Sequence, residues 1–306
     1  MKNRDPRDYS WLPADVLDFI ARTEAAYPAD AVNFTIAEQR AFYDTMCAAF
    51  DPPHPAGLRT EDVTIAGVPC RRYVPTAPKA GVTALYFHGG GFIVGGLHSH
   101  DAIVAELAEG AQVITIAVDY RLIPEHRHPA AYDDCVAVVD AVAGPKVLVG
   151  DSAGASLAAS ISAMRPGVIG GQVLIYPGLT SDPELPSFSR HAFAPMLTRA
   201  DCEFYRGMRF DGPPPEGDVT AEAMAASDYG DLPPTAIFTA EADPIASHGV
   251  EYAARLAEAG VAVEMTEEPG MVHGYLRARH MAAGARDSFA RITRALEALA
   301  TQAAAQ

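Results

Sequence analysis

The chain has 306 residues, of which 49% are hydrophobic and 20% charged, and its formal net charge is -16. A chain of this length and apolar content can bury a large core, whereas the negative charge disfavours binding to nucleic acids and to anionic membrane surfaces. The 4 cysteines are widely spaced and form no C-x-x-C pair, so we expect reduced, mostly buried thiols in a cytosolic protein.

The N-terminal part of the chain is predicted to be helical. Residues 1–8 are polar and have no apolar segment after them, so they do not resemble a signal peptide. From Trp11 to Phe50 the apolar residues recur at helical spacing, and Pro28 and Asn33 separate two helices. The proline-rich residues 51–55 then form a stiff connector. The sequence has no run of about 18 apolar residues, so it predicts no membrane-spanning helix.

Strand and helix patterns alternate through most of the remaining chain. Two antiparallel strands, residues 61–65 and 71–74, are joined near Gly67. Further strands are predicted at residues 82–87, 113–118, 146–150, 172–176, 235–239 and 261–266. Helices are predicted at residues 101–110, 130–143, 248–259 and 285–300, with another that starts after Ser152 and stops near Pro166. This alternation predicts an α/β fold with a mainly parallel sheet flanked by helices.

The alternation is interrupted between Pro177 and Pro234, where prolines, scattered aromatic residues and short helical pieces occur. Apolar residues such as Phe188, Leu197 and Tyr205 give this segment surface to bury. We therefore expect a lid or an insertion over a site, with disorder as the alternative.

Residues 150–154 read Gly-Asp-Ser-Ala-Gly, after a strand-like apolar run and before small helix-forming residues. In a strand–turn–helix context, the G-x-S-x-G pattern places a serine hydroxyl on a tight turn, and the flanking glycines leave room for that turn. The alternative is a glycine-rich turn ahead of an amphipathic helix. The strand and helix on either side favour Ser152 as a nucleophile.

A serine nucleophile needs an adjacent base, and the base needs an acid that fixes its tautomer. Where such a turn follows a strand of an α/β sheet, the chain order is serine, acid, histidine. Asp243 follows the strand at 235–239 and His273 follows the strand at 261–266, so they are the predicted partners. The alternatives are a helix-capping Asp243, Glu241 as the acid, and a structural loop role for His273.

A second motif, His88-Gly89-Gly90-Gly91, follows the strand at 82–87. Three glycines expose backbone N–H groups which, with the N–H of Ala153, can bind an oxygen that gains negative charge. A phosphate-binding loop is the competing use of such a turn. The glycines do not fit G-x-G-x-x-G and no G-K-[ST] follows, so nucleotide binding is not predicted.

The remaining histidines do not predict a metal site. His98, His100, His126 and His128 lack an H-E-x-x-H pattern and a carboxylate-rich frame. We expect these side chains at the surface or in supporting roles.

Together these motifs resemble the hormone-sensitive-lipase family of bacterial esterases, which has the α/β-hydrolase fold. The resemblance extends from about Val82 to His273 and includes residues 88–92, 119–126, 128–134, 150–154, 175–177, 243–245 and 273–275. It implies a single α/β-hydrolase domain over residues 1–306. It also implies a helical cap, formed by residues from about 1–55 and about 178–230.

The resemblance also implies the role of each site residue. Ser152 attacks, His273 moves the proton and Asp243 orients His273. The oxyanion hole would comprise the N–H groups of Gly90, Gly91 and Ala153, with Gly89 supporting the turn. The implied substrate is a small-molecule ester with a short or medium acyl chain. No cofactor is implied, and dimers would form through an edge strand.

Other activities are compatible with the same motifs. An amide-directed hydrolase similar to an arylformamidase, or a transacylase, would use the same three side chains. Some ligand receptors resemble this family but lack the histidine, which this chain has at His273. Specificity depends on side chains of the cap, for which Trp11, Phe34, Phe188 and Phe204 are the candidates.

Overall fold

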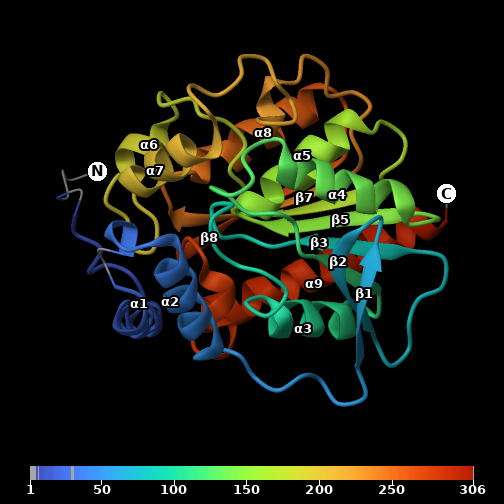
Figure 1. Ribbon diagram of the computed structural model, residues 1–306, viewed down its shortest axis with the longest axis horizontal. Helices are drawn as coiled ribbons and strands as arrows, with labels where there is room; N and C mark the ends of the chain where they lie inside the picture. Colours follow the sequence, from blue (N-terminus) through green and yellow to red (C-terminus); the bar gives the residue numbers. More distant parts are fainter. Residues whose placement is uncertain (1–4, 6, 29–30, 306) are drawn as a thin grey trace.

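The computed structural model describes residue 5, residues 7–28 and residues 31–305. Residues 1–4, 6, 29 and 30, which belong to the predicted cap, lie outside the described residues, as does residue 306. Within the described chain, 8 strands form one sheet in the order β1-β2-β4-β3-β5-β6-β7-β8 (Figure 1). They are β1 (Arg59–Ile65), β2 (Val68–Val74), β3 (Thr83–Phe87), β4 (Ile114–Val118), β5 (Lys146–Asp151), β6 (Gly171–Ile175), β7 (Thr235–Ala242) and β8 (Val263–Val272).

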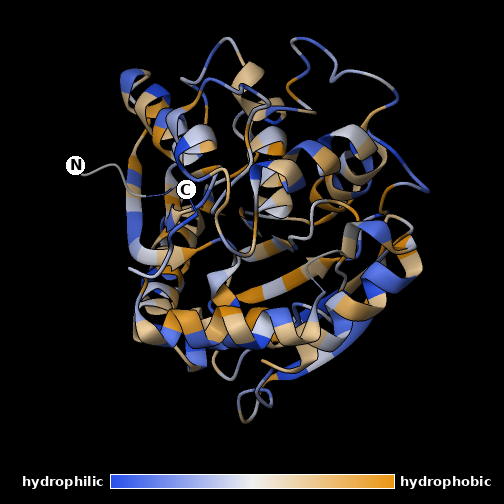
Figure 2. Cartoon of the chain, turned by 90° about the vertical axis from the view of Figure 1, so that its left-hand side faces the viewer, coloured by the Kyte–Doolittle hydropathy of each residue, from blue (hydrophilic) through white to orange (hydrophobic). Residues whose placement is uncertain are grey.

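Strand β2 is antiparallel to both of its neighbours, and the pairings from β4 through β8 are all parallel. Parallel strands that are covered on both faces need continuous apolar runs. Strands β5 and β6 contain such runs at residues 147–149 and 173–175, and every residue in both strands is buried. Figure 2 shows the central strands coloured mostly as hydrophobic. The predicted α/β fold with a mainly parallel sheet is confirmed.

Helices cover both faces of the sheet (Figure 1). On one face lie α3 (Asp101–Ala111) and α9 (Ala283–Ala304), whose Ile103 and Leu296 belong to the same apolar cluster. On the other face lie α4 (Ala130–Ala141), α5 (Ala153–Met164) and α8 (Ala246–Glu258), with Leu157 and Leu256 in a second cluster. The sheet therefore separates two apolar layers.

Four further helices lie together beyond one end of the sheet (Figure 1). They are α1 (Ala14–Ala26), α2 (Ile36–Ala48), α6 (Pro186–Arg190) and α7 (Arg199–Arg209). Capping boxes fix the start of two of them, with Thr35 and Glu38 at α2 and Thr198 and Asp201 at α7. The segment between β6 and β7 otherwise contains only short or irregular pieces among the described residues, including η2 (Ala223–Ala225), as its sequence predicts.

The last two strands are longer than the sequence predicts. Strand β7 continues to Ala242 and β8 to Val272, because these two residues still pair across a register shift. Charged residues, Pro269 and Gly270 interrupt the apolar pattern of β8, so the sequence pattern ends early. The short helix η3 (Tyr275–His280) was not predicted. Because β7 and β8 are extended, Asp243 and His273 follow their strands directly.

The cysteines agree with expectation, since Cys47, Cys70 and Cys135 are buried, Cys202 is partly exposed, and all are free thiols.

As for membrane spans, the described segments contain no helix that combines the length and the apolar character needed for crossing a bilayer.

Candidate active site

Ser152 occupies the tight turn between β5 and α5, at φ +52° and ψ -117°. Residues other than glycine adopt such a conformation only where the surrounding structure imposes it. The close packing depends on both glycines of the motif. A Cβ on Gly154 would lie 1.9 Å from the carbonyl oxygen of Phe87, and one on Gly150 would lie 2.4 Å from the backbone of Gly154. The predicted strand–turn–helix is therefore present, with Ser152 in the wall of a cavity.

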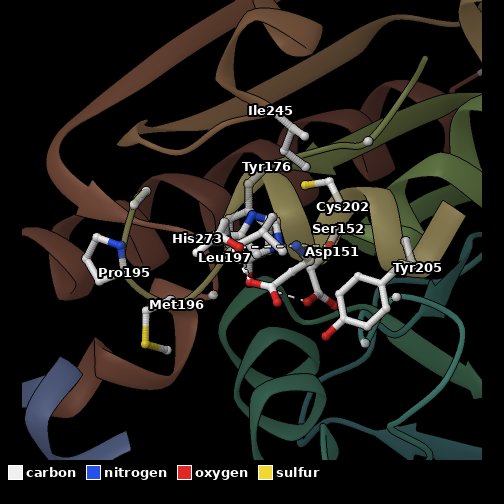
Figure 3. Close-up of a pocket in the computed structure, with 18 of the residues that line it drawn as sticks. Asp151, Ser152, Tyr176, Pro195, Met196, Leu197, Cys202, Tyr205, Ile245 and His273 are labelled. Atoms are coloured by element: carbon white, nitrogen blue, oxygen red, sulfur yellow. Dashed lines mark hydrogen bonds between the residues drawn. The ribbon is translucent and has the colours of Figure 1, made fainter. Parts of the chain in front are cut away.

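The three predicted partners lie in series. Nε2 of His273 is 2.8 Å from Oγ of Ser152 (Figure 3). Nδ1 of the same ring is 2.7 Å from Oδ2 of Asp243. The Asp243 side chain is fully buried, and its Oδ1 accepts the N–H of Ile245 at 2.9 Å. Asp243 thus forms both contacts that the sequence left as alternatives, to the histidine and to the start of the next helix.

The rival acid, Glu241, has a different partner. Its Oε2 accepts the N–H of Gly270 at 2.8 Å, which ties the end of β7 to the end of β8. The ring of Tyr176 lies 4.6 Å from the His273 ring, with 57° between the planes, and fixes one side of the imidazole. Sequence reasoning gave Tyr176 no role, although the residue belongs to the Ile175-Tyr176-Pro177 motif.

The glycine loop, residues 88–91, lies beside the serine turn. Gly90 and Gly91 have φ of +122° and +59°, and both line the cavity together with Ala153 and Ser152. The N–H of Gly89, in contrast, donates to Oδ1 of Asp151 at 2.9 Å. The Gly89 amide is therefore engaged in holding the loop, so Gly89 does not belong to the three-glycine set of oxyanion donors. This agrees with the supporting role that the resemblance implies for Gly89. Gly90, Gly91 and Ala153 remain the candidate donors.

His88 supports the glycine loop through contacts with Tyr120 and with the backbone of Gly89. Its ring stacks on Tyr120, with centroids 4.3 Å apart and 11° between the planes, and its Nδ1 lies 2.8 Å from the carbonyl oxygen of Gly89. Burial lowers the pKa of His88 to about 3, so the imidazole is neutral. His88 therefore helps to fix the position of the glycine loop.

A buried polar network supports the serine turn and was missed from the sequence. Oδ1 of Asp151 also accepts the hydroxyl of Tyr86 at 2.8 Å, and Oδ2 lies 3.5 Å from Nε2 of His100. Arg277 of η3 donates to the same Nε2 at 3.3 Å. Burial alone would raise the pKa of Asp151, but His100, Arg277 and Tyr86 outweigh it and hold that pKa well below its usual range. The carboxylate therefore links the serine turn to both neighbouring loops.

Of the four histidines that the sequence set aside, His126 is exposed and the other three have ordinary partners. Nε2 of His98 lies 2.7 Å from Asp44, and Nε2 of His128 lies 3.3 Å from Asp218. His100 belongs to the Asp151 network. Among the described residues, histidine, cysteine and carboxylate side chains form no group of three or more that could hold a metal ion.

The cavity above Ser152 has a volume of about 760 Å³. Its wall combines the serine turn and the glycine loop with residues of α1, α6 and α7, among them Leu17, Ile20 and Phe188. Figure 3 shows two further wall residues from α7, Cys202 and Tyr205. Of the four candidate specificity residues, Phe188 lines the cavity. The other three were wrong for this structure, since Trp11, Phe34 and Phe204 are not part of its wall.

Comparison with known proteins finds similar hydrolases and esterases. A family model described as the alpha/beta hydrolase fold matches residues 84–277. Carboxylesterase NlhH of Mycobacterium tuberculosis is 36% identical over 242 residues, which cover 72% of this chain and 76% of the relative. Ethyl acetate hydrolase of Pseudomonas putida is 35% identical over 231 residues, covering 69% and 72%.

The fold is similar to that of solved structures over nearly its whole length. The hyperthermophilic esterase of the archaeon Pyrobaculum calidifontis superimposes with a TM-score of 0.84 and 26% identity, covering 94% of this chain and 99% of that esterase. The family match, the relatives and the sheet order all agree with the resemblance seen in the motifs. The chain belongs to the α/β-hydrolase family, within its hormone-sensitive-lipase group of esterases.

Proposed function

We propose that this chain, a carboxylic ester hydrolase by its family membership, acts through a serine acyl-enzyme mechanism. The observation that carries the proposal is the continuous series of contacts from Ser152 through His273 to Asp243. A serine hydroxyl is a weak nucleophile unless a base accepts its proton. Nε2 of His273 is at hydrogen-bond distance for that transfer, and the buried Asp243 carboxylate stabilises the imidazolium that results.

The proposed reaction has two halves. Oγ of Ser152 attacks the ester carbonyl carbon, and the carbonyl oxygen becomes an oxyanion that accepts N–H groups of Gly90, Gly91 and Ala153. The tetrahedral intermediate expels the alkoxide, which takes the proton from His273 and leaves as the alcohol. Water then attacks the acyl-enzyme with His273 again as the base, and the carboxylic acid is released.

We also propose that the substrates have short or medium acyl chains. The cavity of about 760 Å³ is bounded by α1, α6 and α7, and these elements act as the cap in this proposal. One relative is named for the hydrolysis of ethyl acetate, an ester with a short acyl chain. A panel of nitrophenyl esters of increasing acyl length tests this part of the proposal, and a preference for long-chain acyl groups would contradict it.

The mechanism is tested by comparing Ser152→Ala with Ser156→Ala. Ser156 lies one helical turn further along α5, and its hydroxyl donates to the carbonyl oxygen of Gly178, so its loss removes a serine from the same cavity wall. We expect Ser152→Ala to lower kcat on nitrophenyl butyrate by roughly 10⁴-fold or more, with far less effect from Ser156→Ala. A neutral phosphonate should label Ser152 in the unmodified enzyme and in Ser156→Ala. Turnover by Ser152→Ala, or labelling of another residue, would refute the mechanism.

A further inference from the structure

One cation in the cavity wall lacks the partners that arginines normally have. Arg209 is the last residue of α7, and its guanidinium carbon lies 4.1 Å from the ring centroid of Phe92 and 5.2 Å from that of Phe210. Phe92 directly follows the glycine loop, and both residues line the cavity that contains Ser152. The charge of Arg209 is thus located on the wall next to the candidate oxyanion donors.

Two other arginines in the cavity wall form side-chain hydrogen bonds of the kind that Arg209 lacks. Arg206, one turn earlier in α7, donates to the carbonyl oxygen of Ser181 at 3.1 Å. Arg277 donates to the hydroxyl of Tyr43 at 2.6 Å. For Arg209, no side-chain hydrogen bond or ion pair is formed with any residue that the structure describes. Its guanidinium is held by aromatic rings alone.

The two carboxylates that act on the charge of Arg209 form hydrogen bonds with other side chains. Glu222 accepts the hydroxyl of Ser181, and Asp218 accepts the hydroxyl of Thr220 at 2.6 Å. Burial lowers the pKa of Arg209 to about 10, even though Glu222 and Asp218 act in the opposite direction. The side chain is therefore a cation at neutral pH that is partly removed from water and has no acceptor from the protein for its N–H groups.

A purely structural role leaves this arrangement unexplained. A cation–π contact uses the charge of the guanidinium, but its five N–H donors still need acceptors. These donors form a planar fork that matches the two oxygens of a carboxylate. A ligand that brings a carboxylate into the cavity would supply the acceptors that the protein does not.

We propose that Arg209 is a specificity residue which binds an anionic group, a carboxylate, carried by the ester substrate. The substrate class is then either the monoester of a dicarboxylic acid or the acyl ester of a hydroxy acid, depending on which side of the ester the carboxylate lies. This inference rests on the proposed ester hydrolysis and names the substrate class for the same cavity.

The test uses two pairs of esters in which a carboxylate replaces an isopropyl group of the same shape. Monoethyl succinate is compared with ethyl isocaproate for the acyl side, and acetylglycolate with isobutyl acetate for the alcohol side. Acid release is followed at constant pH by titration. The variants are Arg209→Met, which removes the charge, Arg209→Lys, which keeps the charge without the fork, and Arg206→Met as the matched control on α7.

We expect the unmodified enzyme to favour the charged ester in one pair. In that pair, Arg209→Met should lower the ratio of kcat/KM for the charged ester to that for its neutral partner by roughly 10- to 100-fold, mainly through KM. Arg209→Lys should give an intermediate ratio, and Arg206→Met should change it by less than about two-fold. The ratio is internal to each variant, so a general loss of activity does not affect it.

Each result supports or overturns the inference. A ratio that is the same in Arg209→Met and the unmodified enzyme for both pairs overturns it, as does hydrolysis of only the neutral esters. If Arg209→Met does not fold, inhibition of isobutyl acetate hydrolysis by free succinate decides. Weaker inhibition in Arg209→Lys supports the inference, and equal inhibition overturns it. Failure of the enzyme to hydrolyse any of the four esters would instead count against the proposed function.

Discussion

Asp151, the residue before the proposed nucleophile Ser152, offers the sharpest test of how the site is held together. Replacing it with Asn keeps the shape but removes a buried charge. The Asn oxygen can still accept from Tyr86 and Gly89, which lie 2.8 and 2.9 Å from Oδ1. An NH₂ group, however, replaces the oxygen that accepts the Tyr176 hydroxyl at 3.3 Å and faces His100. Arg277 also loses the nearby negative charge that compensates its own.

The expected cost follows from these contacts. Breaking a buried ion pair costs about 3–5 kcal/mol. Arg277 reaches Asp151 only through His100, and two of the hydrogen bonds persist, so we expect the lower end, about 3 kcal/mol. In a protein of this size, that corresponds to a fall in Tm of roughly 5–10 °C. The Gly89 anchor persists, but the Tyr176 hydroxyl loses its acceptor, and the Tyr176 ring packs against His273. We therefore expect kcat to fall as well, by roughly ten-fold.

The pH dependence gives a second check. The folded-state pKa of Asp151 is depressed, so its stabilisation is present above the unfolded pKa of about 4 and disappears only as the pH falls through the depressed value. The Tm of Asp151→Asn should therefore lie below that of the unmodified protein by the same amount at about pH 6 and at about pH 8. Thermal melts and steady-state kinetics measure both effects.

A surface carboxylate serves as the control. Asp140 pairs with Arg165 at 3.0 Å, and its side chain is 48% exposed. Asp140→Asn should change stability by less than about 1 kcal/mol. If Asp151→Asn melted within about 1 °C of the unmodified protein and kept its kcat, the buried network would not have the supporting role described above.

Three further outcomes are expected. Gly154→Ala should abolish activity and lower the yield of folded protein, because its Cβ would lie 1.9 Å from the Phe87 carbonyl oxygen; a folded, active variant in circular dichroism and ester assays contradicts this. Gly91→Ala would place a Cβ 2.8 Å from the Tyr205 ring at a residue with φ +59°, so it should lower kcat roughly ten-fold, and adding Tyr205→Ala should restore part of the lost kcat. A double-mutant cycle without coupling between the two substitutions would argue against this clash. Burial raises the pKa of the Cys202 thiol, so Ellman's reagent should react slowly with the native protein at about pH 8 and with all 4 thiols after unfolding; rapid reaction in the native state is the opposing result.

The glycine motifs and the secondary structure were predictable from the sequence because they depend on local backbone requirements. The turn at Ser152 needs Gly150 and Gly154, and the loop at Gly90 needs a positive φ, so the residue types themselves indicate these conformations. The alternation of strands and helices likewise reflects hydrophobic periodicity within each segment. These local signals were sufficient to predict the fold class and to nominate Ser152 as the candidate nucleophile.

Other features depend on how distant segments meet, which periodicity does not encode. Ser152 and His273 are 121 positions apart, and only the order of β5, β6, β7 and β8 brings them within 2.8 Å. The engagement of the Gly89 amide by Asp151 and the placement of Arg209 over Phe92 are also contacts between separate elements. The sequence by itself therefore determined the local turns and the candidate site residues, and the tertiary structure decided which of them share a cavity, because that depends on packing between elements far apart in the chain.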